Sequence, residues 1–329
     1  MLASASSFSL ISVVLPAFNE GEALQRVIPS IVEALKSETI EIIVVDDGST
    51  DGTRNSILFL KGRWPMLRYV RFSRNFGKEA ALSAGLRVAR GDAVILMDAD
   101  GQHPPALIKT FLEKWRDGFE VVCGVQVARN ETPLKKLAKR MYYRMMETGS
   151  SIVIPPDAGD FRLLSRNVVD AINAMPERKR FMKGLYAWVG FRTEMIPFAA
   201  APRVAGTSKY GWIQLFKLGL TGVTAFTIAP LRIVSILGFI ISASSFLFGI
   251  YLLLEHFFDG NQLPGWATLA VGMTFFSGLQ LLALGFIAEY IAGMYEELKQ
   301  RPLYIIAEDT ATPAAAVSLV PSEPAVLGR

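Results

Sequence analysis

Two aspartates separated by a single residue, Asp98 and Asp100, follow the apolar run Ala93-Val94-Ile95-Leu96-Met97. A continuous apolar run is typical of a buried strand, so both carboxylates are expected at a strand end. Mg²⁺ prefers hard oxygen ligands, commonly one or two carboxylates completed by water and phosphate, and Gln102 could add an amide oxygen. A metal held there would neutralise charge on a departing diphosphate. Two surface aspartates in a turn would give the same pattern, so the position after a strand is what favours the metal site.

Polar residues also follow two other apolar runs, at Asn19-Glu20 and at Asp46-Asp47. Asp46 and Asp47 could accept hydrogen bonds from a nucleobase or a ribose. The Asp-Gly-Ser sequence that begins at Asp47 is also typical of a turn, and both roles can hold at once. His103, which precedes two prolines, is expected to structure its loop rather than to catalyse.

These polar clusters are separated by alternating strand-like and helix-like segments. Apolar or β-rich runs occur at 12–16, 41–45, 67–72, 93–97 and 121–125, and 78–89 is one of the segments of helical character between them. The alternation predicts an α/β fold with a mostly parallel sheet, whose ligands bind beyond the carboxyl ends of the strands. No G-x-G-x-x-G follows the first strand and no G-x-x-x-x-G-K-[ST] occurs, which argues against dinucleotide-binding and P-loop proteins.

The composition excludes several classes of protein. Of the 329 residues, 51% are hydrophobic and 19% are charged, which excludes a disordered chain. The 34 basic residues face 30 acidic ones, a smaller bias than a nucleic-acid-binding face usually shows, so no nucleic acid partner is expected. Cys123 is the single cysteine, in an apolar run, and is expected to be a buried strand residue without an intrachain disulfide. With only two histidines, a histidine-rich metal site is excluded.

The apolar excess is concentrated in two uncharged runs, 233–254 and 266–288. Each is long enough to cross a bilayer as a helix, and a pair of buried core helices is the alternative. The segment between them contains no Lys or Arg, whereas both outer flanks are basic, so the positive-inside rule places both termini in the cytoplasm. Segment 208–218 has the amphipathic pattern of a helix lying in the headgroup plane. The tail after Arg301 is expected to be flexible and without chemistry.

Four motifs of the soluble half occur in the order that glycosyltransferase family 2 shows, and the chain resembles that family over about residues 10–300. They are Leu15–Glu20, Val45–Asp51, Arg74–Glu79 and Asp98–Pro105. One small departure is Ala17-Phe18, where many members have Tyr-Asn. Three further segments, followed by the two apolar runs, carry a closer resemblance: Gly159–Leu163, Arg180–Phe191 and Arg203–Tyr210. With them the chain resembles the polyprenyl-phosphate glycosyltransferases of the dolichol-phosphate mannose synthase and bactoprenol glucosyltransferase type.

The resemblance implies a GT-A fold, which is α/β and Rossmann-like with a mostly parallel sheet. Interfacial amphipathic helices and two transmembrane helices would follow it. The expected boundaries are 1–205 for a cytoplasmic catalytic domain, 206–230 for interfacial helices, 231–290 for two spans with a short extracytoplasmic loop, and 291–329 for a cytoplasmic tail. The expected location is the inner, cytoplasmic membrane, where a multi-pass homo-oligomer would contact membrane lipid.

The resemblance also implies roles for individual residues. Asp98, Asp100 and Gln102 would hold Mg²⁺ or Mn²⁺. Asp160 resembles the family's active-site aspartate and would act together with Asp100, by orienting a sugar hydroxyl or stabilising an oxocarbenium-like centre. A structural pair of Asp160 with Arg162 is the alternative. The acceptor phosphate would be held by Arg129, Arg140 and Arg203. The nucleotide sugar would be held by Pro16, Phe18, Glu20, Asp46, Asp47, Lys78, Asp98, Ala99, Arg203 and Lys209.

The implied reaction is the inverting transfer of a hexose from a nucleotide sugar to undecaprenyl phosphate, giving a lipid-linked sugar for modifying a surface glycan such as lipopolysaccharide O-antigen. Similarity favours UDP-glucose as the donor, and GDP-mannose, N-acetylglucosamine and amino-arabinose donors stay open. A processive polysaccharide synthase is a second enzyme class, but the chain has no Q-x-x-R-W and only two apolar spans. A non-catalytic membrane scaffold or flippase partner is a third class, which leaves the polar clusters at three strand ends unexplained.

Overall fold

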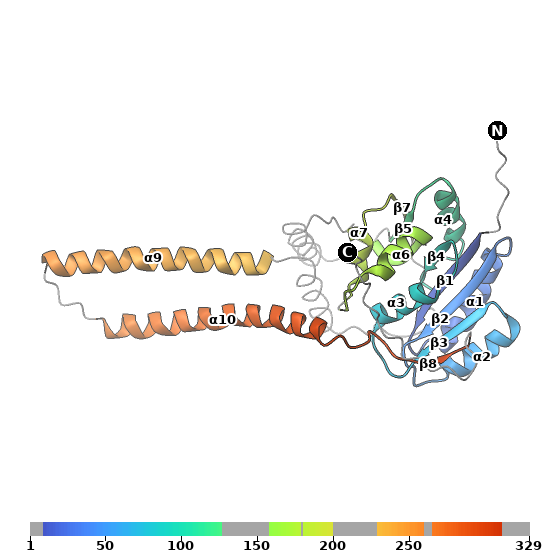
Figure 1. Cartoon of the computed structure of the whole chain (residues 1–329), viewed down its shortest axis with the longest axis horizontal. Coiled ribbons are helices and arrows are strands. Elements are labelled where there is room, and N and C mark those ends of the chain that lie inside the picture. The colour runs from blue at the N-terminus through green and yellow to red at the C-terminus, as the bar shows by residue number, and fades with distance from the viewer. Residues whose placement is uncertain (1–8, 127–157, 179, 200–228, 260–264, 311–329) are drawn as a thin grey trace, which may run out of the picture. The chain divides into compact units, whose positions relative to one another are not determined.

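The computed structural model describes residues 9–126, 158–178, 180–199, 229–259 and 265–310, whose helices and strands are labelled in Figure 1. The chain divides into two compact units. The first comprises 1–133, 154–211 and 301–329, and the second comprises 134–153 and 212–300. The first unit contains the sheet and the second contains two long apolar helices.

Four parallel strands form the centre of the sheet. They are β1 (Leu10–Ala17), β2 (Thr39–Asp46), β3 (Leu67–Phe72) and β4 (Ala93–Leu96). β1 pairs with β2 on one side and with β4 on the other, and β2 pairs with β3. Their Val, Ile and Leu side chains are buried, as in the middle of a parallel sheet that is covered on both faces. The predicted α/β fold with a mostly parallel sheet is therefore confirmed.

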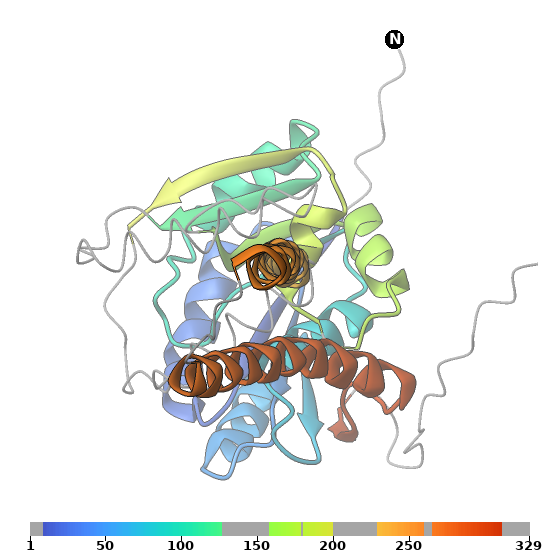
Figure 2. The ribbon, with the colours of Figure 1, turned by 90° about the vertical axis from the view of Figure 1, so that its left-hand side faces the viewer.

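Three further strands extend the sheet beyond β4 and make it mixed. They are β5 (Val121–Gln126), β6 (Ala158–Ser165) and β7 (Thr193–Phe198). β6 runs antiparallel to both β4 and β5, and β7 runs parallel to β5. β7 is the yellow arrow at this edge of the sheet in Figure 2. Cys123 is buried in β5, as expected.

The helices of the first unit form where the sequence has helical periodicity. In α1 the buried residues Leu24, Val27, Ile28 and Ile31 recur at spacings of three and four, which gives the helix one apolar face. α3 packs so closely on β1 that a Cβ on Gly85 would lie 2.2 Å from Val14 Cγ1. The helices are α1 (Gly21–Ala34), α2 (Thr53–Arg63), α3 (Lys78–Val88), α4 (Leu107–Arg116), α6 (Arg166–Ala174) and α7 (Met182–Trp188).

The segment after Arg301 forms a strand, so the expectation of a flexible tail is wrong for residues 302–310. β8 (Ile306–Asp309) pairs antiparallel with β3 and lies at the edge of the sheet. β8 is stabilised by this long-range pairing and by ion pairs with Arg54 and Arg68. A short sequence without strong periodicity does not predict such long-range contacts. Residues 311–329 lie outside the described residues.

The second unit contains α9 (Ala229–Asp259) and α10 (Trp266–Leu298). Among the described residues, the segment Phe275–Leu298 is long and apolar enough to cross a membrane, with a mean hydropathy of 1.6. Ile236–Phe248, in α9, is a shorter apolar stretch. Large apolar side chains on both helices are exposed, among them Phe239 and Leu281. The interfacial helices predicted for 206–230 fall almost entirely outside the described residues.

Candidate active site

The carboxyl ends of β1, β2 and β4 lie side by side, which brings the polar clusters of the sequence to one edge of the sheet. Ala17 is paired with Asp46 across β1 and β2, and the amide of Asp47 donates to the carbonyl of Ala17 at 2.9 Å. On the other side of β1, the amide of Met97 donates to the carbonyl of Val14 at 3.1 Å. This is the edge where ligands of open α/β sheets bind.

The Lys78 ammonium joins two carboxylates at this edge. Its Nζ lies 2.6 Å from Asp98 Oδ1 and 2.8 Å from Asp160 Oδ2. Lys78 is the first residue of α3, Asp98 follows β4, and Asp160 is the third residue of β6. The three residues therefore come from three separate elements, and the sheet topology is what assembles them.

The antiparallel direction of β6 explains why Asp160 reaches this site. Leu96, the last residue of β4, is paired with Arg162. The chain runs backward along β4, so the residues that precede Arg162 lie beyond the carboxyl end of β4, next to Asp98. The sequence analysis predicted no strand at 158–165, and so it placed Asp160 by resemblance alone.

The opposite charges in this half-buried cluster stabilise one another. Burial alone would raise the pKa of Asp160, but the cations Lys78 and Lys183 hold it well below its usual range. Burial alone would lower the pKa of Lys78, but Asp160 and Asp98 raise it well above its usual value. Asp160 is thus a carboxylate, and Lys78 an ammonium, across the whole physiological range.

Arg162, which was the alternative partner for Asp160, helps to lower the pKa of that carboxyl and has further contacts of its own. Its guanidinium lies over the ring of Tyr186 at 3.7 Å from the centroid, and its Nη2 donates to the carbonyl of Gly159. Three buried atoms of this cluster have no hydrogen-bond partner among the described residues: Asp160 Oδ1, Arg162 Nε and the Tyr186 hydroxyl. Buried polar groups are normally paired, so this set points to a polar ligand that hydrogen-bonds here.

Glu79, next to Lys78, holds the N-terminus of α7. Its Oε2 accepts the amide of Met182 at 2.9 Å. Burial first, and then the charge of Asp160, raise the pKa of Glu79 to about 7. Sequence reasoning assigned no role to Glu79 or Tyr186, although both lie inside segments that carried the resemblance.

The predicted metal ligands are oxygen donors, which suit Mg²⁺ or Mn²⁺, and they are few in number. Asp98 and Asp100 supply two carboxylates, the number that Mg²⁺ takes when phosphate and water complete its coordination. Asp100 Oδ1 accepts the amide of Gln102 at 3.0 Å. Within the described part of the chain, no cluster of three or more His, Cys, Asp or Glu side chains is arranged to hold a metal. The residues therefore fit a cation that is shared with a bound diphosphate rather than a closed protein cage.

His103 structures the loop that contains the predicted metal ligands Asp98 and Asp100, as expected. Its Nδ1 accepts the amide of Asp98 at 3.1 Å, and its ring stacks on Phe161 at 4.7 Å between centroids. Burial lowers the pKa of His103, which keeps the imidazole neutral and able to accept this hydrogen bond. Ala99, between the two aspartates, is buried in the core cluster.

Asp46 and Asp47 are both engaged within the protein. Asp46 accepts the amide of Ser49 at 2.8 Å and the hydroxyl of Tyr69 at 2.7 Å. Asp47 accepts the amides of Phe76 at 2.6 Å and Gly77 at 2.9 Å, and burial raises its pKa. These contacts support the turn role, and a direct contact with a nucleotide stays a prediction.

Some of the remaining predicted site residues lie in the part of the chain that the structure describes, and others lie outside it. Pro16 is buried in β1, while Phe18 and Glu20 are half-buried in the loop that follows. The Glu20 amide donates to Thr53 Oγ1 at 3.1 Å, which ties this loop to the start of α2. Arg129, Arg140, Arg203 and Lys209 lie outside the described residues, so their roles stay predictions.

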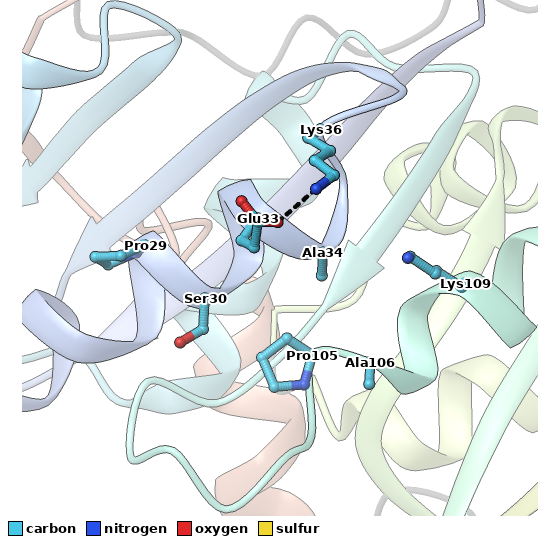
Figure 3. Close-up of a pocket in the computed structure, with 8 residues that line it drawn as sticks. All are labelled: Pro29, Ser30, Glu33, Ala34, Lys36, Pro105, Ala106 and Lys109. Atoms are coloured by element: carbon cyan, nitrogen blue, oxygen red, sulfur yellow. Dashed lines mark hydrogen bonds and ion pairs between the residues drawn. The ribbon is translucent and has the colours of Figure 1, made fainter.

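A hollow on the surface lies elsewhere, between the end of α1 and the start of α4 (Figure 3). Its charged residues include Glu33 and Lys36, which pair with each other at 2.7 Å. None of its lining residues is a predicted site residue, and they bring no cluster of carboxylates together. The Lys78 cluster is therefore the stronger candidate for the active site.

The family model for glycosyl transferase family 2 matches residues 12–172. This range contains most of β1, all of β2 to β6, the predicted metal ligands and Asp160. A prophage bactoprenol glucosyl transferase homolog of Escherichia coli is 39% identical over 299 residues, which cover 90% of this chain and 98% of that protein. The chain belongs to glycosyltransferase family 2.

Other family 2 members are similar at the same level. An uncharacterized glycosyltransferase, sll0501, of Synechocystis is 42% identical over 301 residues, which cover 91% of this chain and 95% of that protein. The bactoprenol glucosyl transferase of Shigella phage SfII is 40% identical over 299 residues, which cover 90% and 97%. The chain is thus a glycosyltransferase and a homologue of bactoprenol glucosyl transferases, as the motifs predicted.

Proposed function

We propose that this glycosyltransferase transfers glucose from UDP-glucose to undecaprenyl phosphate at the cytoplasmic face of a membrane, with inversion. The observation that carries the proposal is the half-buried cluster of Lys78, Asp98 and Asp160 at the carboxyl edge of the sheet. Support for the acceptor and the sugar comes from relatives at about 40% identity whose names state glucosyl transfer and bactoprenol.

The acceptor's chemistry explains why the site is built from charges rather than from a strong base. A phosphate monoester has a second pKa near 6, so at pH 7 it is largely a dianion and is already nucleophilic. A carboxylate as acidic as Asp160 has little capacity to take a proton. Asp160 is better suited to orient a sugar hydroxyl, with Arg162 and Tyr186 beside it.

A divalent cation would be held by Asp98, Asp100 and Gln102. When bound, Mg²⁺ or Mn²⁺ would neutralise charge on the departing nucleoside diphosphate. Lys78 would add a positive charge on the same side and keep Asp98 and Asp160 at a fixed separation. The predicted acceptor cations Arg129, Arg140 and Arg203 would bring the lipid phosphate to the sugar.

Membrane attachment is the second part of the proposal. The apolar helices α9 and α10 would form two spans within 231–290, with both termini in the cytoplasm. Exposed apolar side chains on these helices support it, and none of the side chains that the structure describes in Phe275–Leu298 is buried within the protein. The catalytic domain (1–205) and interfacial helices (206–230) would then lie at the inner membrane, next to the lipid acceptor, and the protein would act as a homo-oligomer.

The test is transfer of a labelled sugar into lipid. Purified protein in bilayers with undecaprenyl phosphate and Mg²⁺ is given labelled UDP-glucose, GDP-mannose or UDP-N-acetylglucosamine, and the lipid extract is counted. We expect label from UDP-glucose, and a loss of about 100-fold or more in Asp100→Ala, because the cation loses a ligand. Asp117→Ala, on the exposed surface at the end of α4, is the control.

Each competing function gives a different result in this assay. If only GDP-mannose labels the lipid, the donor is GDP-mannose and the reaction is still transfer of a hexose to a lipid phosphate. Label in a long polymer would identify a processive synthase. A lack of any transfer, together with no metal-dependent binding of UDP by calorimetry, would contradict the proposal and favour a scaffold. Near-normal turnover in Asp100→Ala would contradict the metal assignment.

A further inference from the structure

The return segment, which we define as Arg301–Thr310, follows α10 in the chain and packs on the edge of the sheet. Its backbone is tied to β3 at both ends. The amide of Ser73 donates to the carbonyl of Ile305 at 3.0 Å, and the amide of Thr310 donates to the carbonyl of Tyr69 at 2.9 Å. Between these bonds, β8 pairs with Val70–Phe72.

Side chains fix the return segment more firmly than an edge strand requires. Arg68 and Asp309 pair at 2.7 Å, with only 16% and 12% of their side chains exposed. Arg54 binds both carboxylate oxygens of Glu308, at 2.8 and 3.0 Å. A two-pronged arginine–carboxylate pair has a defined geometry, so the segment has one register on β3.

An aromatic chain leads from this segment to the candidate site. The ring of Tyr304 stacks on Phe72, with centroids 4.9 Å apart and planes within 10°. Phe72 meets Phe76 edge to face at 5.7 Å. The amide of Phe76 donates to Asp47, and the loop that contains Phe76 ends at Lys78. Two aromatic contacts thus connect Tyr304 to Phe76, whose amide binds Asp47.

We propose that Tyr304 is a positioning residue: through Phe72 and Phe76 it holds the loop 73–77, and so fixes Asp47 on the nucleotide side. Stacked and edge-to-face aromatic pairs prefer defined geometries, so the rings transmit position as well as burying area. The expected effect of Tyr304 on nucleotide binding rests on the proposed function. Its expected effect on the position of the loop 73–77 does not depend on that function.

The experiment compares Tyr304→Ala with Tyr304→Phe, which keeps the stacking ring, in the full chain. Phe59→Ala removes an exposed aromatic ring on α2 and is the matched control. Hydrogen exchange of the peptide that contains Phe76 and Gly77 is measured without ligand. The KM for UDP-glucose and kcat are measured in the lipid transfer assay, and the unfolding midpoint is recorded for each variant.

We expect exchange at Phe76 and Gly77 to become at least about 10-fold faster in Tyr304→Ala, and the KM for UDP-glucose to rise by about 10-fold with kcat within about twofold. Tyr304→Phe and Phe59→Ala should match the wild type. Unchanged exchange at Phe76 and Gly77 would overturn the inference. So would a general loss of protection across the sheet, because that is the result of a merely structural role. Faster loop exchange in a protein whose wild type binds no nucleotide would support the positioning role and contradict the proposed function.

Discussion

Lys78 is the residue on which the geometry of the candidate site depends. Its ammonium is the nearest of the cations that keep Asp160 ionised, and it contacts Asp98 from the predicted metal pair. Removing one partner of a buried ion pair leaves an uncompensated charge, which costs more than the pair itself contributes. The function of Asp160 is therefore expected to depend on Lys78, although the two are far apart in the sequence.

Lys78→Met should lower both turnover and stability. We expect turnover to fall by about 100-fold or more, and the free energy of unfolding to fall by about 3 kcal/mol, because Asp160 loses its nearest cation. Adding Asp160→Asn to this variant should restore part of the stability but none of the activity. Chemical denaturation and the lipid transfer assay measure the two effects, and Lys114→Met, at an exposed pair, is the control. A Lys78→Met protein with wild-type turnover would show that the cluster is not the active site.

Glu79 predicts a pH dependence of stability. Its pKa is raised from 4.5 to about 7 in the folded protein, so between these values the folded state binds more protons than the unfolded state. Stability therefore falls as pH rises from 4.5 to 7, and the full penalty of up to about 3 kcal/mol is present above pH 7. Glu79→Gln keeps an oxygen that can accept the Met182 amide and removes this penalty.

We expect Glu79→Gln to raise the unfolding midpoint relative to wild type at pH 8, and to change it much less at pH 4.5. Thermal unfolding across this range measures the difference, with Glu113→Gln on the exposed face of α4 as the control. An equal effect of Glu79→Gln at both pH values would mean that the pKa of Glu79 is the same in the folded and the unfolded protein.

Among individual residues, the sequence predicted those that lie at strand ends and missed those that a distant element brings in. Asp98 and Asp100 were predicted because they follow an apolar run. The contact between Lys78 and Asp160 was not, since residues 78 and 160 meet only when β6 runs antiparallel to β4. Asp46 shows a different limit of sequence analysis. Its position after a strand predicted a ligand contact, but its oxygens accept hydrogen bonds from the Ser49 amide and the Tyr69 hydroxyl.

At the scale of elements, β1 to β5 could be predicted, and β6, β7 and β8 could not. The runs of β1, β2 and β4 are mainly apolar because both of their faces are buried. β6 carries Asp160 and Arg162 among its apolar residues, and β8 is short and charged, so neither has a strong strand pattern. Both are held by pairing with strands that are distant in sequence, which no local pattern reports.

The turn after β2 makes a prediction at this scale. Gly48 has φ 70°, and a Cβ added there would lie 2.5 Å from the backbone carbon of Arg74. Gly48→Ala should lower the free energy of unfolding by about 1–3 kcal/mol, and should raise the KM for UDP-glucose, because the loop that binds Asp47 must move. Gly52→Ala is the matched control, since Gly52 has an ordinary φ of −73° and no atom within 4 Å of the added Cβ. Equal stability of the two variants would show that the loop adapts without cost.

For the whole molecule, the composition separates into two parts. The sheet unit buries its apolar residues in its own core, whereas α9 and α10 leave large apolar side chains exposed. An apolar surface of this extent needs lipid or a protein partner to cover it. The sequence predicted two spans, and the structure describes one segment that meets the length and hydropathy required, so the second span is the part that needs a direct test.

Cys123 makes that test simple, because it is the single cysteine and is buried in β5. A cysteine placed by Asn261→Cys, in the segment between the two apolar runs, should react with a membrane-impermeant maleimide added to intact cells with a permeabilised outer layer. A cysteine placed by Gln300→Cys, after α10, should react only when the inner membrane is opened, since the positive-inside rule places the basic flanks in the cytoplasm. The wild type should stay unlabelled in both conditions. Labelling of Gln300→Cys from outside would reverse the topology. Labelling of neither variant until the membrane is opened would mean that α9 and α10 lie on the cytoplasmic side without crossing.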